Sequence, residues 1–554
     1  MIVSFGPAFA SRTYDVCVVG AGPVGIALAL ELARHGKSVL QLESGGTAPN
    51  TRVQAMADAA IDHPDWHVPM AIGVQRSLGG AGNLWGGRCV AYDPVDFTER
   101  PGFDLPGWPI GPDDLAPSAE RGAHYADIAR PEFQRAIEGL TIADPDFTAD
   151  HLERWSIEPR PQVAHARAIA EAKTLDLCLG VTLAGLDIDS AGQVTAATVQ
   201  TEDGTRHTIR ATRFVLACGG VENARLLLNV EAAHATPNRF GGPDGMLGRG
   251  YMGHLYGSVA EVVFASETLD AALDYTSAGQ GVYVRRRFNP SEALQAREGL
   301  LNVALWPEFP AIWDASHRNG VLSTAYLALS IPPLGRKLVA ESIRRNYVGS
   351  GPLNLWAHLR NVLLDLPATS VFIPRFLYRR KIARPRQPGF FQRNAARRYA
   401  LRFHAETRPD PNNRITLDDA RDDVGLRRAR ITLAYRRDDV ADLLRAHDLF
   451  ADWLTRTGLG RMSYARPAEQ RIDHILAQAY DGHHQIGTTR MAESAADGVV
   501  DRNCRVFGTQ NLYVAGASVL PTSSQANPTY TAITLAVRLA AHLVSVHSDL
   551  EWRV

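Results

Sequence analysis

The sequence is poor in cysteine, and this limits the metal and redox chemistry that the chain can carry. Its five cysteines are scattered, with no CxxC pair, no cysteine and histidine spacing typical of zinc, and no CxxCH motif for covalent haem. We therefore expect no metal site and no haem. Cys17 and Cys218 lie in apolar runs typical of buried strands, where a thiol behaves as a small hydrophobic group. A reducing, cytoplasmic location fits this pattern.

Neither sign of charge is in excess. The 554 residues include 58 basic and 59 acidic side chains, which gives a formal net charge of -1. Such a chain has no overall field that would attract nucleic acid or anionic lipid. We therefore expect small, neutral molecules as partners and no nucleic acid.

Apolar runs long enough to cross a membrane are also missing. The most apolar stretch, 353–377, contains His358, Arg360, Asp365 and two prolines, which a membrane-spanning helix would tolerate poorly. The N-terminus lacks the basic segment of a signal peptide. We expect neither an integral membrane span nor a signal peptide.

A basic segment at 375–386 follows this apolar stretch. One interpretation is an element that docks on a membrane surface or on a partner. The other is an amphipathic helix on the core followed by a solvated basic loop. We favour the second interpretation, because runs of like charge are usually solvated.

The N-terminal segment 14–45 has the pattern of a βαβ unit that binds a dinucleotide. Gly20, Gly22 and Gly25 stand in GAGPVG between an apolar run and a helical pattern. Glycines at this spacing permit a tight turn, close approach of a pyrophosphate, and packing of the helix on the strand. Glu43 ends the next strand, where its carboxylate can accept the hydroxyl groups of a ribose. FAD and NAD both remain possible at this point.

A second glycine cluster favours a flat ligand, although ordinary loops also contain such clusters. It is SLGGAGNLWGG at 77–87. Short alternating apolar runs at 181–217 then predict a β-meander that returns to a parallel strand.

The C-terminal part contains the candidate catalytic groups. HHQIGTTRM at 483–491 and SQANPTYTAITLA at 524–536 bring a histidine pair, glycine, threonines and an Asn-Pro turn between apolar strands and a long apolar helix. A lone histidine is most often structural, but these surroundings favour a catalytic role beneath a cofactor.

The whole set of motifs resembles that of the glucose-methanol-choline (GMC) oxidoreductases. The matching segments are GAGPVG with Glu43, GGAGNLWGG, GWPI, LACGGVENARLLL, GRGYMGH, PDPNNRITL and the C-terminal block. NLWGG and ANPTYTAITLA resemble the branch that holds pyranose 2-oxidase and fructose dehydrogenase. One position departs from the family, because Gly516-Ala517-Ser518 replaces an Asp-x-Ser sequence and removes an aspartate contact to the cofactor.

The resemblance implies an α/β fold with two domains. A Rossmann-like FAD-binding domain, of the type also found in p-hydroxybenzoate hydroxylase, would comprise 12–110, 160–250 and 475–554. An inserted α+β substrate-binding domain, built on an antiparallel sheet, would comprise 251–474. Residues 111–159 would connect them.

The resemblance also implies the site residues. His484 would be the catalytic base and Asn527 its partner. The cofactor-binding residues would be Gly20, Gly22, Gly25, Glu43, Gly79, Gly80, Asn83, Leu84, Trp85, Gly86, Val181, Cys218, Gly219, Gly516, Ala517, Asn527 and Thr529. We expect non-covalent FAD, because Leu84 stands at the position before Trp85 where some pyranose oxidases have a histidine that is linked to the cofactor.

The implied reaction is oxidation of a secondary alcohol of a sugar or glycoside to a ketone. His484 would take the hydroxyl proton while a hydride passes to N5 of the flavin. Oxygen, a quinone or another protein would accept the electrons, and an oligomer is compatible with the sequence. The alternatives are oxidation of a sterol or another alcohol, an NAD-dependent dehydrogenase, and a flavoprotein that binds without catalysis.

Overall fold

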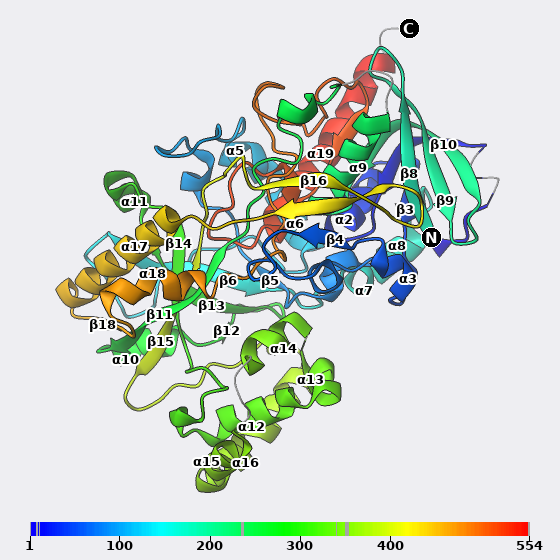
Figure 1. Cartoon of the computed structure of the whole chain (residues 1–554). Helices are drawn as coiled ribbons and strands as arrows, with labels where there is room; N and C mark the ends of the chain where they lie inside the picture. The colour runs from blue at the N-terminus through cyan, green and yellow to red at the C-terminus, as the bar shows by residue number, and fades with distance from the viewer. Residues whose placement is uncertain are drawn as a thin grey trace.

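Two large β-sheets organise the molecule, and a third, smaller sheet lies beside them (Figure 1). The computed structural model describes residues 2–6, 9, 11–233, 238–339, 341–349 and 354–551, with the backbone alone at 341–343, 346 and 546–551. The first sheet has eight strands in the order β1-β7-β3-β2-β10-β9-β8, with β19 paired to β10. The strands are β1 (Ile2–Val3), β2 (Thr13–Val19), β3 (Val39–Glu43), β7 (Leu175–Leu179), β8 (Val181–Ile188), β9 (Val194–Thr201), β10 (Arg206–Leu216) and β19 (Leu512–Val514).

The predicted βαβ unit is confirmed. It consists of β2, α2 (Pro23–Arg34) and β3, and β2 pairs in parallel with β3. All five residues of β3 are buried, which explains why this strand is largely apolar rather than alternating. Because the glycine turn joins the carboxyl end of β2 to the start of α2, the fold creates an anion site there.

The predicted meander is confirmed as well, and its last strand joins two kinds of pairing. Residues 206–209 of β10 pair antiparallel with β9, whereas 210–216 pair in parallel with β2. The end of β10 also pairs in parallel with β19. In this way β10 brings the C-terminal part of the chain beside the N-terminal glycine turn.

The second sheet is antiparallel, as predicted for the inserted domain. Its order is β18-β11-β15-β14-β13-β6-β5, with β12 paired to β13. The strands are β5 (Arg88–Cys89), β6 (Phe147–Trp155), β11 (Leu255–Phe264), β12 (Thr276–Ser277), β13 (Tyr283–Pro290), β14 (Val303–Glu308), β15 (Arg398–Ala405) and β18 (Gly460–Tyr464). Helices α17 (Arg437–Arg456) and α18 (Ala468–Leu476) lie beside it (Figure 1).

The predicted domain boundaries differ from the sheet memberships at two places. β6 lies inside the predicted connecting segment 111–159, and β5 lies inside the predicted FAD-binding segment 12–110, yet both strands belong to the second sheet. The sequence did not reveal that β6 belongs to the second sheet, because its partner strand β13 lies more than a hundred residues away in the chain.

The predicted C-terminal helix is α19 (Thr529–Glu551), which packs against α2 and α6 (Ala119–Tyr125). The small third sheet has the order β16-β17-β4. Its strands are β4 (Ala59–Ile61), β16 (Arg414–Arg421) and β17 (Arg427–Thr432). None of the described helices is long and apolar enough to cross a bilayer.

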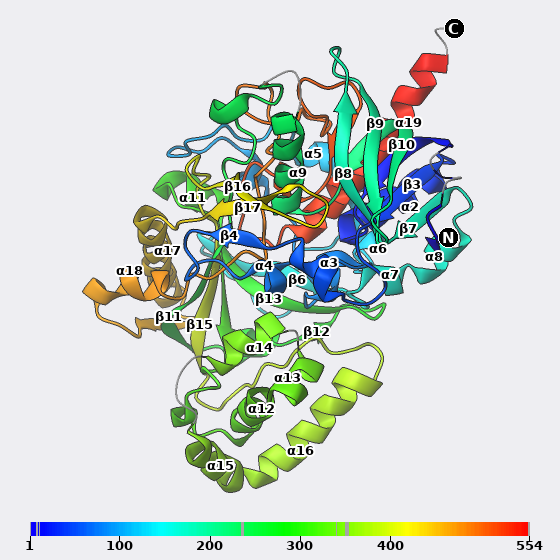
Figure 2. The ribbon, with the colours of Figure 1, turned by 45° about the vertical axis from the view of Figure 1, so that its right-hand side comes forward.

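A lobe of helices projects from one end of the molecule (Figure 2). It comprises α12 (Gly320–Ser330), α13 (Pro332–Leu338), α14 (Glu341–Val348), α15 (Leu355–Leu364) and α16 (Leu366–Leu377). The favoured interpretation of this region was wrong in two respects. The buried side chains of α15 are the polar His358 and Asn361, while most of its leucines are exposed. Residues 375–382 are helical, as the end of α16 and a π turn, rather than a loop.

Candidate functional site

The first glycine turn has the shape required to bind a phosphate. Gly20 has φ of +106°, and a Cβ added there would lie 2.5 Å from the carbonyl oxygen of Ala217. A Cβ on Gly25 would lie 2.2 Å from the carbonyl oxygen of Gly20. Gly20 and Gly25 are therefore required by the packing of the turn itself.

Gly22 is different, because the protein does not itself require a glycine there. Its backbone is extended, with φ of -80° and ψ of -174°. The nearest atom to an added Cβ is Cα of Gly80, at 3.9 Å. The space is open and faces the N-terminus of the twelve-residue helix α2, where backbone N–H groups favour an anion. A cradle of this shape, which a Cβ at Gly22 would enter, fits a cofactor pyrophosphate.

The second glycine cluster lies directly on the first. The backbone N–H of Gly79 donates to the carbonyl of Ala21 at 2.8 Å. A Cβ on Gly80 would lie 2.9 Å from Cα of Gly22. Within the loop, Asn83 Nδ2 donates to the carbonyl of Leu78 at 3.0 Å. The structure therefore brings the two glycine clusters together into one cradle.

Glu43 links this cradle to the carboxyl end of β3. Its carboxylate accepts the backbone N–H of Ala21 at 3.0 Å and that of Gly45 at 2.9 Å. The carbonyl of Gly45 in turn accepts the N–H of Gly180, the residue before Val181. Glu43 ends β3, and the buried Val181 begins β8 just beyond the carboxyl end of the neighbouring β7. The two residues therefore lie near each other, on the side where an adenosine would bind.

A third group of predicted residues is held together by Asn223. Its side chain accepts from the N–H of Cys218 at 2.9 Å and donates to the carbonyl of Ala515 and to Ser518 Oγ. Gly219 and Gly516 beside it have φ of +93° and +138°. Asn223 thus aligns the segment after β10 with the segment after β19, where the family has its aspartate.

The predicted base lies in a turn that directs its side chain. Asp481 Oδ1 accepts the backbone N–H groups of Gly482, His483 and His484 at 2.8, 3.0 and 3.2 Å. Three residues further on, Gly487 donates its N–H to the carbonyl of Ala517 at 3.3 Å. These bonds hold the histidine segment alongside the residues predicted to contact the flavin.

A chain of hydrogen bonds defines the tautomer of His484. His254 Nε2 donates to the carbonyl of Ser523 at 3.1 Å, so that Nδ1 of a neutral His254 is an acceptor. His484 Nδ1 lies 3.0 Å from it and therefore carries the proton. Arg88 Nε donates to Asn527 Oδ1 at 2.7 Å, which turns the amide nitrogen of Asn527 toward His484 Nε2 at 2.9 Å. His484 Nε2 therefore carries no proton, and its lone pair accepts the amide N–H of Asn527.

The electrostatics keep this imidazole neutral. Burial lowers the pKa of His484 below its ordinary value of 6.5, although Asp481 partly opposes the shift. Burial alone would raise the pKa of Asp481, but His484 and His254 outweigh it and hold that pKa well below its usual range. A neutral base beside a carboxylate is suited to accept a proton near pH 7.

Sequence reasoning missed several neighbours of His484. His254, His404, Arg88 and Asp481 were given no role, although His254 stands in the GRGYMGH motif. His254 directly precedes β11 and His404 lies on β15, and their rings stack with centroids 4.2 Å apart. The pairing of these two strands, which no local pattern reveals, brings both rings to the site.

The three histidines lie close enough to hold a metal ion. One nitrogen from each of His254, His404 and His484 lies within 4.8 Å of the others. Nδ1 of each ring already has a partner, since that of His404 is 2.7 Å from the carbonyl oxygen of Gln525. That these histidines bind no metal remains a prediction, which metal analysis of the purified protein can test.

A buried network of arginine and glutamate side chains holds Arg88, which donates to Asn527. Arg88 forms an ion pair with Glu153 at 3.1 Å, and Glu153 also pairs with Arg285 at 2.7 Å. Both guanidinium groups lie 5.2 Å from the ring centre of Trp306. Because Arg88 is fixed in this way, the direction of the Asn527 amide is fixed as well.

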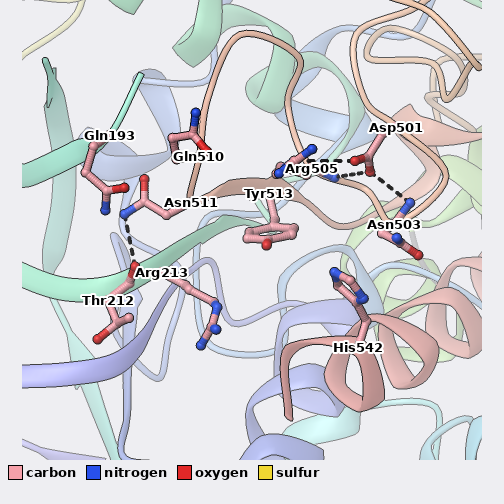
Figure 3. Close-up of a pocket in the computed structure, with 10 residues that line it drawn as sticks. All are labelled: Gln193, Thr212, Arg213, Asp501, Asn503, Arg505, Gln510, Asn511, Tyr513 and His542. Atoms are coloured by element: carbon pink, nitrogen blue, oxygen red, sulfur yellow. Dashed lines mark hydrogen bonds and ion pairs between the residues drawn. The ribbon is translucent and has the colours of Figure 1, made fainter. Parts of the chain in front are cut away.

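A surface cavity of about 330 Å³ lies elsewhere, beside β10, β19 and α19 (Figure 3). It is lined by Gln193, Thr212, Arg213, Asp501, Asn503, Arg505, Gln510, Asn511, Tyr513 and His542. His542 is thirteen residues beyond Thr529 on α19, or about 20 Å along the helix. The cavity contains none of the predicted site residues and plays no part in the chemistry described above.

Comparisons with known proteins agree with this arrangement. Residues 15–290 match the family model described as FAD dependent oxidoreductase, and residues 409–536 match the model described as GMC oxidoreductase. The chain is 23% identical to 2-methyl-1,2-propanediol dehydrogenase of Mycolicibacterium austroafricanum, over 97% of this chain and 96% of the relative. It is 21% identical to the fructose dehydrogenase large subunit of Gluconobacter japonicus, over 95% and 97%. The solved structure of pyridoxine 4-oxidase from Mesorbium loti shares the fold, with a TM-score of 0.53 and 17% identity over 96% of this chain and 99% of that one.

Proposed function

Because the chain belongs to the GMC family of FAD-dependent oxidoreductases that act on CH–OH groups, we propose that it oxidises a secondary alcohol of a sugar or glycoside to a ketone. The observation that carries the proposal is the unprotonated His484 Nε2, which accepts the amide N–H of Asn527 at 2.9 Å, a bond that a substrate hydroxyl would replace. His484 takes the proton of the substrate hydroxyl, and Asn527 donates a hydrogen bond to the oxygen that loses it.

The cofactor residues are proposed on the same basis. FAD, when bound, supplies the hydride acceptor at N5. Gly22 and α2 hold its pyrophosphate, Glu43 its ribose, and Asn223 keeps the two segments beside the catalytic residues in register.

The substrate class rests on the polarity of the site and on one relative. Buried hydrogen-bonding groups extend away from His484, because the ring of His404 lies 5.6 Å from its ring and bonds to Gln525, which in turn bonds to Arg287. A substrate with several hydroxyl groups can satisfy such a site, whereas a sterol would leave polar groups unpaired. The likeness to the fructose dehydrogenase large subunit supports a sugar.

A small diol is the second candidate, favoured by the likeness to 2-methyl-1,2-propanediol dehydrogenase. A screen of anaerobic flavin reduction with monosaccharides, glycosides, 2-methyl-1,2-propanediol and a sterol separates the candidates. We expect reduction by a sugar or glycoside, with a ketone as product. Reduction by the diol alone would replace the proposed substrate class. Repeating turnover with oxygen, a quinone and an artificial acceptor identifies the reoxidant.

The pH dependence of flavin reduction should reveal the neutral base. Protonated His484 cannot accept a proton, so the rate should fall as the pH drops through a value below 6.5 and stay level above it. The fall in rate belongs to His484 together with Asp481, whose carboxylate lies 3.6 Å from Nδ1 of His484. Replacing Asp481 by asparagine removes the carboxylate that raises the pKa of His484, so the fall in rate should move to still lower pH. Stopped-flow rates measured across the acidic range check both shifts, and a fall in rate centred above pH 6.5 would contradict the lowered pKa of His484.

We expect FAD to be bound without a covalent link. Leu84 offers no nucleophilic atom, and burial raises the pKa of the Cys218 thiol far above its usual range, which leaves it unreactive. Heat or acid denaturation should release all of the flavin into the supernatant. Yellow colour that stays with the precipitated protein, confirmed by the mass of a flavin-linked peptide, would show a covalent bond.

A further inference from the structure

The outer side of α15 and α16 exposes large apolar side chains. The exposed fractions are 83% for Trp356, 71% for Leu363, 73% for Leu364 and 68% for Val371. Ile382, in the π turn that follows, is 69% exposed. The helices α15 and α16 that carry them lie at the end of the molecule (Figure 2), and exposed apolar surfaces of this kind mark sites of interaction.

Directed hydrogen bonds fix this orientation of α15. His358 Nδ1 lies 3.1 Å from Ser323 Oγ, and its Nε2 lies 3.3 Å from the carbonyl oxygen of Trp313. Asn361 Nδ2 donates to the carbonyl of Ala315 at 2.8 Å and to Ser323 Oγ at 3.2 Å. A rotation that buried the leucines would break these bonds and expose the polar side chains. The helix therefore presents its apolar face outward because of its own contacts.

The same segment is strongly basic, although the whole chain is nearly neutral. Residues 354–386 contain seven basic side chains and one acidic side chain. The acidic one, Asp365, accepts the N–H of Gly320 at 2.9 Å and so caps α12. Among the described residues, no salt bridge involves these seven cations. Burial, together with the neighbouring Arg386, lowers the pKa of Arg380 to about 10.

We propose that the outer face of α15 and α16, with the basic segment 375–386, binds the surface of a bilayer that contains anionic lipid. Trp356 and the leucines enter the interfacial region, and the arginines and Lys381 contact the phosphate groups of the lipids. The helices have ten and twelve residues, far fewer than the roughly twenty that span a bilayer, so they lie in the plane of the surface.

Charge favours an anionic bilayer over a second copy of the chain as the partner of this face. A symmetric pair formed through this face would bring two basic segments together in an apolar contact, and like charges repel there. An anionic bilayer offers the opposite charge along with an apolar layer. The proposal concerns a surface outside the catalytic site and is independent of the proposed substrate.

Vesicle flotation of the full-length, FAD-loaded protein tests the proposal. We expect binding to vesicles of phosphatidylcholine with phosphatidylglycerol to exceed binding to phosphatidylcholine alone by at least about tenfold. Because part of the attraction is electrostatic, salt at about 0.5 M should weaken it. Equal binding to both kinds of vesicle, or binding to neither, would overturn the proposal.

Two sets of variants locate the contact. Trp356→Ser/Leu363→Ser/Leu364→Ser removes the apolar anchors, and Arg375→Glu/Arg379→Glu/Lys381→Glu reverses the charge. All six side chains are exposed, so folding, flavin content and reduction by a small substrate should not change. Each set should reduce vesicle binding by about tenfold or more.

Matched controls carry the same kinds of change elsewhere. Val163→Ser removes an exposed apolar side chain on α7 (Pro161–Ala164), and Arg210→Glu reverses an exposed charge on β10. Both should bind vesicles like the wild type. A wild-type dimer that ignores vesicles and dissociates in the apolar triple variant would show that a second copy covers this face, and would overturn the proposal.

Discussion

Replacing His484 by alanine should slow flavin reduction by about 10²-fold to 10⁴-fold, the usual contribution of a positioned general base. This corresponds to roughly 3 to 5 kcal/mol of activation free energy. The lone pair of Nε2 is lost, and His254 remains bonded to Ser523 and cannot take its place. FAD should stay bound, because its proposed anchors at Gly22 and Glu43 make no contact with the imidazole. Anaerobic stopped-flow reduction with an identified substrate measures the change.

Two neighbouring variants serve as controls for His484. His483→Ala should have a much smaller effect, because His483 lies outside the cluster formed by the other three histidines. Asn527→Ala should fall between the two, since one hydrogen bond to the reacting oxygen is lost while the base remains. A wild-type rate in His484→Ala together with a slow rate in His483→Ala would assign the base to the other histidine.

Replacing Gly22 by valine should weaken FAD binding by about a hundredfold or more, equivalent to roughly 3 kcal/mol. The backbone at Gly22 is extended, so any residue can adopt it, and an added Cβ meets no protein atom closer than 3.9 Å. The valine side chain would occupy the space over the N-terminus of α2 that the pyrophosphate needs. Titration of the apoprotein with FAD, followed by flavin fluorescence, measures the affinity, and thermal unfolding of the apoprotein should be nearly unchanged.

Gly25→Ala is the matched control for Gly22. Its Cβ would lie 2.2 Å from the carbonyl oxygen of Gly20, so the apoprotein itself should lose about 1 to 3 kcal/mol of stability. If Gly22→Val bound FAD like the wild type, the open cradle would not be the pyrophosphate site. Loss of stability in Gly22→Val equal to that in Gly25→Ala would show a packing role instead.

Local patterns in the sequence were sufficient to predict the strands and the helix that we propose bind the cofactor. The apolar run, glycine turn and helical period around Gly20 specify β2, α2 and β3, because each of these features depends on neighbours within about forty residues. The family resemblance named His484 and Asn527, and the fold places their side chains 2.9 Å apart. Their catalytic roles remain proposals that the variants above test.

Only the tertiary structure decided which residues surround the proposed base and which face of α15 is exposed. His254, His404 and Arg88 reach His484 and Asn527 through strand pairings between distant segments, and such pairings leave no local period in the sequence. The helical period of α15 shows that it has two faces, but period alone cannot say which face is buried. Hydrogen bonds from His358 and Asn361 to the neighbouring α12 and to the carbonyl of Ala315 decide that, and they turn the apolar face outward.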